Sequence, residues 1–447
     1  MNSDSQMLDL LQGLVVKAKK KGATAADAVF IETKSLSVAR RLGNMEKLER
    51  SEGYDVGLRT LIGNRQAIAS SSDFSPEALE ELTSRAIAMA KVVPEDPFCG
   101  LADPDQLATS HIDVDSFDPS EPNEEILIEW SQKAEDSARA VQGITNSEGA
   151  EAGWGCANIS VVGTNGFSHS YSGSHYSLSV SVLAGEGTEM ERDYDYTGAV
   201  YAEDMLSPEI VGENAGQKAV KRLKPRKART AQVPIIYDPR VSRGLLGHLT
   251  SAINGSSIAR GTSFLKDKME EQIFSEGITI CDDPHRPRGL RSKPFDAEGV
   301  TNKKRELVNN GILSSWILDL RSSRQLDLET TGHASRGTGS PPSPSATNVY
   351  LEPGLQSPKE LMNDIKNGLY VTELIGMGVN GLTGDYSRGA AGFWIENGEI
   401  TYPVSEITIA GNLNDMFLRL SPANDLEFRY GIDAPTIRID GMTLAGK

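Results

Sequence analysis

Residues 233–255, VPIIYDPRVSRGLLGHLTSAING, constrain the fold of this chain more than any other segment. The segment opens with a short apolar run that is typical of a β-strand. Asp238 and Pro239 then predict the start of a helix, because aspartate is a good N-cap acceptor and proline suits the first helical position. We expect Asn254 and Gly255 to end this helix, with the glycine in a left-handed conformation. The apolar positions that recur at helical spacing are Val241, Leu245, Leu246, Leu249, Ala252 and Ile253.

His248 lies on the apolar face of this predicted helix. A zinc peptidase places its first ligand in such a position, with a glutamate beside it as general base and a second histidine about one turn further on. This chain has Leu249 beside the histidine, Ala252 four residues after it and Ile253 five residues after it. Neither register supplies a second zinc ligand, so the sequence favours a core histidine over a metal ligand.

The composition indicates a globular protein without a nucleic-acid partner. The 447 residues allow two or three domains, and an apolar share of 38% with 24% charged residues is ordinary for globular proteins. The net charge of −17 works against contact with a phosphate backbone. The one dense basic run, residues 218–229, has no interleaved aromatic side chains, so we expect a solvated helix end and linker there.

Cysteine usage and hydropathy indicate a cytoplasmic protein without a membrane partner. Cys99, Cys156 and Cys281 are far apart and form no CxxC pair, which fits a reducing compartment. The first residues lack a basic-then-apolar signal segment, and no apolar run approaches the ~18 residues that a membrane span needs.

The first half of the chain predicts antiparallel strands with helices packed on them. Helical patterns and alternating segments follow one another at residues 4–20 (helix), 25–71 (strands), 76–92 (helix), 124–141 (helix), 147–200 (strands) and 208–223 (helix). Asn165-Gly166 predicts a hairpin turn within the second group of strands. Residues 224–232 are the expected domain boundary.

The second half is predicted to be mostly β, built around the helix Pro239–Asn254. The run 311–320, GILSSWILDL, predicts a strand, and Asn397-Gly398 predicts a hairpin. Residues 331–346 are of low complexity, so we expect a long surface loop with His333 exposed. The predicted fold class is therefore α+β with two domains, residues 1–225 and residues 230–447.

Other catalytic signatures are absent from the sequence or weak. Cys281, Asp282, Asp283 and His285 are metal-ligand types, but spacing this tight is typical of a turn whose aspartates bond local N–H groups. No nucleophile elbow, Rossmann fingerprint or Walker motif occurs. A triad assembled from distant serines and aspartates stays open at this point.

Four motifs in the second half carry a resemblance to a known family. They are GLLGHLTSAINGSSIARGTSFLKDKM, DDPHRPRGLRSKPFDAEGVTNKKRELVNNGIL, PSATNVYLEPG and GVNGLTGDYSRGAAGFWIENGEITYPV. The chain resembles the TldD/TldE (PmbA) family of paired bacterial and archaeal peptidase subunits. In the TldD branch the helix carries His-Glu-x-x-x-His, and a later cysteine completes the zinc site. This chain keeps His248, has Leu249 and Ile253 at the other two positions, and has no cysteine after Gly411. It therefore resembles the TldE/PmbA branch.

The resemblance implies a subunit that works in proteolysis without its own zinc site. The expected partners are a TldD-like subunit in a heterodimer, or a second copy in a homodimer, and extended peptides that are unfolded or modified, as in bacteriocin or antitoxin processing. Zinc is expected in the partner subunit and no cofactor in this chain. Residues 1–225 would serve assembly or form a cavity wall, and residues 230–447 would be a peptidase-like domain. The residues that the resemblance assigns to the peptide cleft are Arg288, Gly289, Phe295, Asp296, Glu298 and Gly299.

Three function classes follow from these observations. The first is a partner subunit that completes the cleft of a zinc-bearing homologue and is silent alone. The second is a stand-alone hydrolase with an unrecognised site. The third, prompted by the family's older description as a modulator of DNA gyrase, is a regulator that binds gyrase or DNA. The missing zinc ligands favour the first class over the second, and the acidic charge disfavours direct DNA contact.

Overall fold

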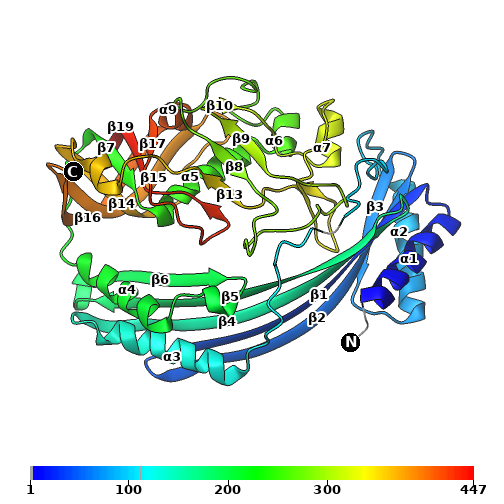
Figure 1. Cartoon of the computed structure of the whole chain (residues 1–447), viewed down its shortest axis with the longest axis horizontal. Coiled ribbons are helices and arrows are strands. Elements are labelled where there is room, and N and C mark those ends of the chain that lie inside the picture. Colours follow the sequence, from blue (N-terminus) through cyan, green and yellow to red (C-terminus); the bar gives the residue numbers. More distant parts are fainter. Residues whose placement is uncertain (1–3, 111, 447) are drawn as a thin grey trace.

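A long curved sheet of six antiparallel strands forms the N-terminal half of the protein (Figure 1). The structure, a computed structural model, describes residues 4–110 and 112–446. The order of strands across the sheet is β3-β2-β1-β4-β5-β6. The bounds are β1 (Ala25–Arg41), β2 (Asn44–Ile62), β3 (Arg65–Ser71), β4 (Ile144–Gly163), β5 (Ser168–Ala184) and β6 (Glu191–Ala199). The expected hairpin turn at Asn165-Gly166 joins β4 to β5.

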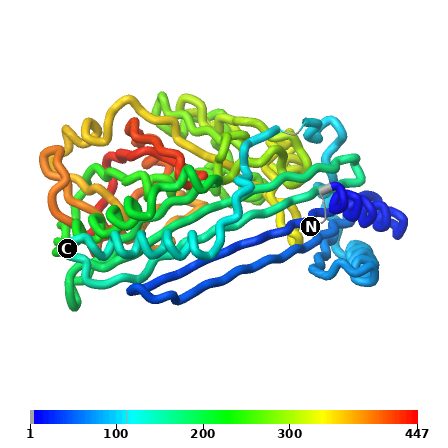
Figure 2. The backbone as a smooth tube through the Cα atoms, turned by 60° about the horizontal axis from the view of Figure 1, so that its bottom comes forward, coloured from blue at the N-terminus to red at the C-terminus, as the bar shows by residue number. Residues whose placement is uncertain are grey.

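Helices cover one face of this sheet at its two ends. The helices are α1 (Asp4–Lys20) and α2 (Pro76–Val92) at one end, and α3 (Glu124–Ala140) and α4 (Pro208–Lys221) at the other, with short 3₁₀ turns η1 (Gly187–Glu189) and η2 (Ala202–Asp204). Alternate side chains of β1 explain the arrangement: Phe30 packs with α1 and α2, and Leu36 packs with α3 and α4. Figure 2 shows α1 and α2, in blue, at the end of the molecule that is far from the C-terminus.

The opposite face of the sheet meets the C-terminal half, whose centre is a small closed barrel. Five strands pair in the ring β7-β14-β15-β16-β19, and the β16–β19 pairing closes it. The pairing of β7 with β14 is parallel and the other pairings are antiparallel. The bounds are β7 (Ala231–Tyr237), β14 (Asn367–Ile375), β15 (Asp385–Glu396), β16 (Glu399–Asn412) and β19 (Ile437–Ala445), with β17 (Leu420–Pro422) beside β19.

A second sheet and several short elements complete this half. The order of its strands is β10-β9-β8-β13-β18. The bounds are β8 (Ile280–Asp282), β9 (Arg305–Asn309), β10 (Ile312–Leu313), β13 (Val349–Leu351) and β18 (Ile432–Asp433); the pair β11 (Ala334–Ser335) and β12 (Ser343–Pro344); and the helices α6 (Gly255–Ala259), α7 (Leu320–Gln325), α8 (Pro358–Met362) and α9 (Leu413–Leu418). None of the helices in the described ranges is both long and apolar enough to cross a bilayer.

The central helix α5 (Pro239–Ala252) starts where the sequence predicts and ends differently. The Asp238 side chain accepts a hydrogen bond from the Arg240 N–H, as expected for an N-cap. Gly255 does not adopt a positive φ; instead Asn254 caps α6, which begins at Gly255. A Cβ at Gly255 would lie 2.9 Å from the Ile317 carbonyl oxygen, so close packing rather than a left-handed turn requires the glycine.

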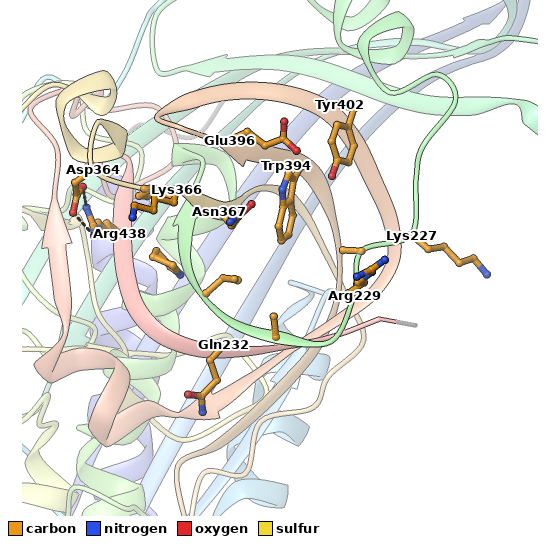
Figure 3. A pocket seen from close by; sticks show the side chains of 15 residues that line it. Lys227, Arg229, Gln232, Asp364, Lys366, Asn367, Trp394, Glu396, Tyr402 and Arg438 are labelled. Carbon is orange, nitrogen blue, oxygen red and sulfur yellow. Dashed lines mark hydrogen bonds and ion pairs between the residues drawn. The ribbon is translucent and has the colours of Figure 1, made fainter.

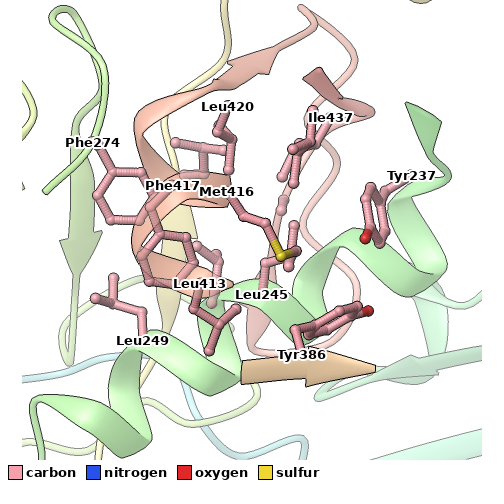
Figure 4. Packing of buried hydrophobic residues seen from close by; sticks show 14 of the residues in the cluster. Tyr237, Leu245, Leu249, Phe274, Tyr386, Leu413, Met416, Phe417, Leu420 and Ile437 are labelled. Carbon is pink, nitrogen blue, oxygen red and sulfur yellow. The ribbon is translucent and has the colours of Figure 1, made fainter. Parts of the chain in front are cut away.

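The apolar face of α5 packs against the barrel and its neighbours. Figure 4 shows Leu245 and Leu249 of α5 directed at a cluster that includes Phe417 of α9. Leu249 and Phe417 are fully buried. Burial of each such side chain stabilises the fold by about 1.5–3 kcal/mol, and this packing fixes α5 relative to the barrel.

Two expectations for the second half are wrong. Only Ile312–Leu313 of the run 311–320 forms a strand, because Ile317 pairs through a bridge with Asn254 and the chain then enters α7. The segment 331–346 is not a solvent-exposed loop throughout, since His333 is 1% exposed. The predicted class, α+β with an N-terminal antiparallel sheet and a mostly-β second half, is confirmed.

Buried charges join the sheet to the C-terminal half. The Asp27 carboxylate on β1 accepts hydrogen bonds from Arg59 Nη2 at 2.5 Å and from Arg336 Nη1 at 2.7 Å. Arg336 belongs to the C-terminal half, and all three side chains are almost completely buried. Burial alone would raise the pKa of Asp27, but the positive charges of Arg336 and Arg59 outweigh it and hold the pKa at about 2.

We expect Asp27→Asn to destabilise the protein by about 3–5 kcal/mol, because it leaves two buried guanidinium groups without their shared counter-charge. Chemical denaturation at neutral pH measures the loss. The difference from the parent protein should shrink as the pH falls from 3.8 towards 2, since Asp27 then takes up a proton in the folded state.

Glu121→Gln is the matched control, because it breaks the exposed ion pair of Glu121 with Arg50. That pair should contribute less than about 1 kcal/mol. A loss for Asp27→Asn as small as that of the control would contradict the structural role of the buried ion pair.

Candidate functional site

The histidine that the sequence singles out lines a pocket at one end of the barrel. The pocket has a volume of about 320 Å³ and lies where β15 begins, next to α5. The side chain of His248 is half-buried, and its ring meets the ring of Tyr386 edge-on with 5.9 Å between centroids. The residues that line the pocket are His248, Ser251, Ala252, Ser257, Thr262, Phe264, Met377, Val379, Gly381, Arg388 and Leu413.

The electrostatics of this pocket oppose a divalent cation. Burial, helped by the positive charge of Arg388, lowers the pKa of His248 below its usual 6.5. The imidazole is therefore neutral at pH 7 and could donate one lone pair to a metal. Arg388 is also a lining residue and no carboxylate or thiol lines the pocket, so a bound cation would face a positive charge with a single ligand.

The two other motif positions lie in the apolar core. Leu249 and Ile253 are both 0% exposed and belong to the cluster around the barrel, whereas Ala252 lines the pocket. A general base at position 249 would have to be buried among aliphatic and aromatic side chains. Within residues 4–110 and 112–446, no group of three or more His, Cys, Asp or Glu side chains is arranged to hold a metal ion. The absence of zinc in this chain stays a prediction.

Comparison with known protein families identifies the family of this chain. Three models match: the PmbA/TldA metallopeptidase domain 1 at residues 26–90, the central domain at 117–223 and the C-terminal domain at 230–446. The metalloprotease PmbA of Escherichia coli O157:H7 is 39% identical over 94% of this chain and 92% of its own length. The chain belongs to the PmbA/TldD metallopeptidase family. The PmbA homologue of Haemophilus influenzae is 37% identical over 100% of this chain and 98% of its own length.

Solved structures share the complete fold. A putative modulator of DNA gyrase from Bacteroides thetaiotaomicron superposes with a TM-score of 0.92, at 25% identity and over 100% of both chains. TldE from Thermococcus kodakarensis superposes with a TM-score of 0.87, at 22% identity, over 98% of this chain and 100% of its own. The second likeness supports the fold alone.

Two of the six residues assigned to the cleft by family resemblance line a different pocket. Arg288 and Gly289 lie in a pocket of about 220 Å³ between the end of β6 and the C-terminal half. Arg288 donates hydrogen bonds to Asp115 and Glu203 at 2.7 Å each and to Asp204 at 3.0 Å. Three carboxylates therefore neutralise Arg288 already.

The other four residues lie at the junction of the two halves. The ring of Phe295 packs edge-on against Phe167 of the sheet, with 5.0 Å between centroids. The Asp296 carboxylate accepts backbone N–H groups of Glu298, Val300 and Ala334. A Cβ at Gly299, which has a φ of +79°, would overlap the ring of Phe167. As placed, these residues stabilise the junction, and their role in a peptide cleft stays a prediction.

A buried histidine–aspartate pair was missed by sequence analysis. His333 Nε2 lies 3.3 Å from Asp282 Oδ2, and His333 Nδ1 lies 2.8 Å from the Thr331 hydroxyl oxygen. Burial opposes the charge of Asp282, but the interaction with His333 outweighs it and lowers the pKa of Asp282. The side chains of Cys281 and His285 have other partners, Glu352 and Asn302, so the sequence cluster 281–285 is not one site.

A further pocket, with a volume of about 740 Å³ (Figure 3), lies at the end of the barrel opposite His248. Its position follows from strand direction, since β7 and β14 begin there and run towards α5. Trp394 lies at its centre, and Arg438 at its side is paired with Asp364. Lys227 and Arg229 of the basic run line this pocket, whereas the zinc-motif and cleft residues expected from the family resemblance do not.

Glu298 predicts a pH dependence of stability. Burial, and next the charge of Asp296, raise the pKa of Glu298 from 4.5 to about 8. The folded protein therefore keeps the Glu298 proton up to about pH 8, whereas the unfolded chain loses it near pH 4.5. The contribution of Glu298 to the free energy of unfolding is highest below pH 4.5 and falls as the pH rises through 8. We expect the Tm of the parent protein to fall by several degrees between about pH 6 and 9, and Glu298→Gln to remove most of this fall.

Glutamine keeps the shape of Glu298 and an acceptor for the Leu320 N–H, which lies 2.9 Å from Glu298 Oε2. Thermal unfolding followed by circular dichroism at several pH values is the measurement. Glu399→Gln on the exposed end of β16 is the control, and its profile should match that of the parent protein. If the Tm fell equally with pH in all three proteins, the assignment of this pH dependence to Glu298 would be contradicted.

Rebuilding the zinc motif by Leu249→Glu with Ile253→His should destabilise the protein by several kcal/mol without creating a site, because it buries a carboxylate and an imidazole in the apolar core. Leu249→Met should change stability by less than about 1.5 kcal/mol. Elemental analysis of untagged protein should find no stoichiometric zinc in the parent or the double variant. About one zinc per parent chain that disappears in His248→Ala, or a folded double variant that takes up zinc, would contradict this.

Proposed function

We propose that this PmbA/TldD family member acts as a TldE-type subunit, which pairs with a zinc-bearing homologue in proteolysis and does not cleave peptides by itself. The observation that carries the proposal is the pocket of His248. It combines one neutral imidazole with the cation Arg388, and its lining includes no carboxylate, thiol or second imidazole that would complete a zinc site and so activate a metal-bound water. Activity in this scheme requires the metal of another chain.

The proposed substrates are extended peptides, and the face of the sheet that is turned away from the helices supports this. Ser37, Gly153 and Ser177 pair across β1, β4 and β5, and their neighbours Leu36, Trp154 and Tyr176 are buried under the helices on the other face. At this position along the strands, the face turned to the C-terminal half therefore carries small hydroxyl and glycine residues. Such a surface accepts a polypeptide with little preference for side chains.

The hairpin of β1 and β2 supports assembly with a second subunit. β3 pairs with β2 only from Val56 onwards, so residues 44–55 form a strand edge without a partner strand in the described chain. Leu48 and Tyr54 on this edge are 50% and 56% exposed. An unpaired edge with apolar side chains favours association. A stable pair would bury ~2,000 Å² or more.

The description of some relatives as gyrase modulators applies to those proteins. For this chain, the net charge of −17 works against direct contact with DNA. The assay below distinguishes a stand-alone hydrolase from the proposed subunit.

The test mixes this chain with a zinc-bearing homologue from the same organism and assays an unstructured peptide. We expect cleavage by the mixture, with chelator sensitivity, and none by this chain alone, because only the homologue can activate water. Gel filtration with light scattering should give a species heavier than the 48.2 kDa monomer in the mixed sample.

Two results would overturn the proposal. One is chelator-insensitive cleavage by this chain alone, which would indicate a hydrolase with an unrecognised site. The other is a clean monomer, with no gain of cleavage when the homologue is present.

A further inference from the structure

The pocket that Arg288 and Gly289 line also contains Arg286, whose side-chain N–H groups have no hydrogen-bond acceptor among the described residues. The pocket has a volume of about 220 Å³ and lies between Gly198 at the end of β6, the loop 286–290 and the loop 428–431. Three arginines line it: Arg286, Arg288 and Arg429. Asp204 and Asp433 line the pocket as well, so its lining carries one more positive than negative charge.

Two of these arginines and the nearby carboxylates are already engaged. Arg288 is bound by three carboxylates. Arg429 Nη2 donates to the Tyr196 carbonyl oxygen at 3.2 Å, which ties the loop to β6. The Asp433 carboxylate accepts three backbone N–H groups, those of Arg429, Tyr430 and Gly431, at 2.8–3.1 Å. Asp433 therefore serves the conformation of its own loop.

Arg286 is held in place but has free donors. Its guanidinium carbon lies 3.2 Å from the centroid of the Phe428 ring, a stacked arrangement that fixes the plane of the group. Phe428 in turn packs edge-on against Tyr350, with 5.2 Å between centroids. Among the described residues no acceptor binds the N–H groups of Arg286, and Asp433, Asp283 and Tyr350 act on it at longer range. A stacked guanidinium with unused donors matches the planar shape of a carboxylate.

We propose that the pocket of Arg286 binds a carboxylate of the peptide substrate, either at the C-terminus or on an Asp or Glu side chain. The peptide nature of the ligand rests on the proposed function, whereas the carboxylate follows from the pocket. Arg286 binds the carboxylate, Phe428 holds the guanidinium plane, and Gly198 on β6 lines the pocket without a side chain.

The experiment measures binding of fluorescent decapeptides to the full chain alone by anisotropy. The peptides are composed of glycine, alanine and serine and carry a free C-terminus, an amidated C-terminus, or an amidated C-terminus with one internal glutamate. We expect the free acid to bind at least about tenfold more tightly than the neutral amide, and Arg286→Gln to remove that difference. If the amidated peptide with one internal glutamate binds as tightly as the free acid, the site also accepts side-chain carboxylates.

Two variants provide the controls. Arg139→Gln removes one positive charge from the exposed end of α3, on the helix-covered side of the sheet, and should leave the preference unchanged. Arg286→Lys keeps the charge without the two parallel donors and should give an intermediate loss, which also keeps the test valid if Arg286→Gln fails to fold.

Equal binding of free and amidated peptides, no measurable binding of any peptide, or an equal loss in Arg139→Gln and Arg286→Gln would each overturn the proposal. These outcomes are independent of the cleavage assay, because that assay depends on the zinc of the homologue. If the chain supports cleavage by the homologue but shows no preference for peptide carboxylates, the proposed function stands and the proposed Arg286 site is wrong.

Discussion

The packing of α5 against the closed barrel is the interaction on which the rest of the structure depends. The buried face of the helix, with Leu245 and Leu249, fixes it on the barrel. Its first turn then reaches the N-terminal sheet, where Arg240 Nη1 lies 2.7 Å from Asp193 Oδ1 on β6. Its last turns present His248 to the pocket at the barrel end. One helix thus sets the relative position of the barrel, the curved sheet and the pocket.

The same packing accounts for the apolar residues that follow the pocket histidine in this member of the PmbA/TldD family. Positions 249 and 253 lie inside the core, where a leucine and an isoleucine contribute apolar burial that a glutamate and a histidine would not. Position 248 faces the pocket, so packing of the apolar core does not require an apolar side chain there. The polar chemistry of the molecule is concentrated instead at the junction of the two halves, where Asp27 and Glu298 are buried among arginines and other carboxyls.

Local signals in the sequence predict much of this fold, since they depend on neighbouring residues alone. Asp238 and Pro239 mark the start of α5, and Asn397-Gly398 forms the turn between β15 and β16. The errors arise where distant segments decide the structure. Position 255 must be a glycine because the backbone of Ile317 approaches it closely, and His333 lies against the buried Asp282. Ile317 is far from Gly255 in the sequence, and Asp282 is far from His333. The stacking of Arg286 on Phe428 likewise joins loops that no sequence pattern connects.

The order of strands in the barrel also bears on how the chain folds. β7 is the first barrel strand to be synthesised, yet its partner β14 follows only after β8, β9, β10 and β13 of the second sheet, and its partner β19 is the last strand of the chain. Pairings of such high sequence separation form slowly, because the loop between them must close first. Until β19 emerges, β7 has an open edge of apolar residues such as Ile235 and Ile236, and that edge exposes the nascent chain to aggregation. This edge of β7 is therefore covered only when the last strand of the barrel has been synthesised.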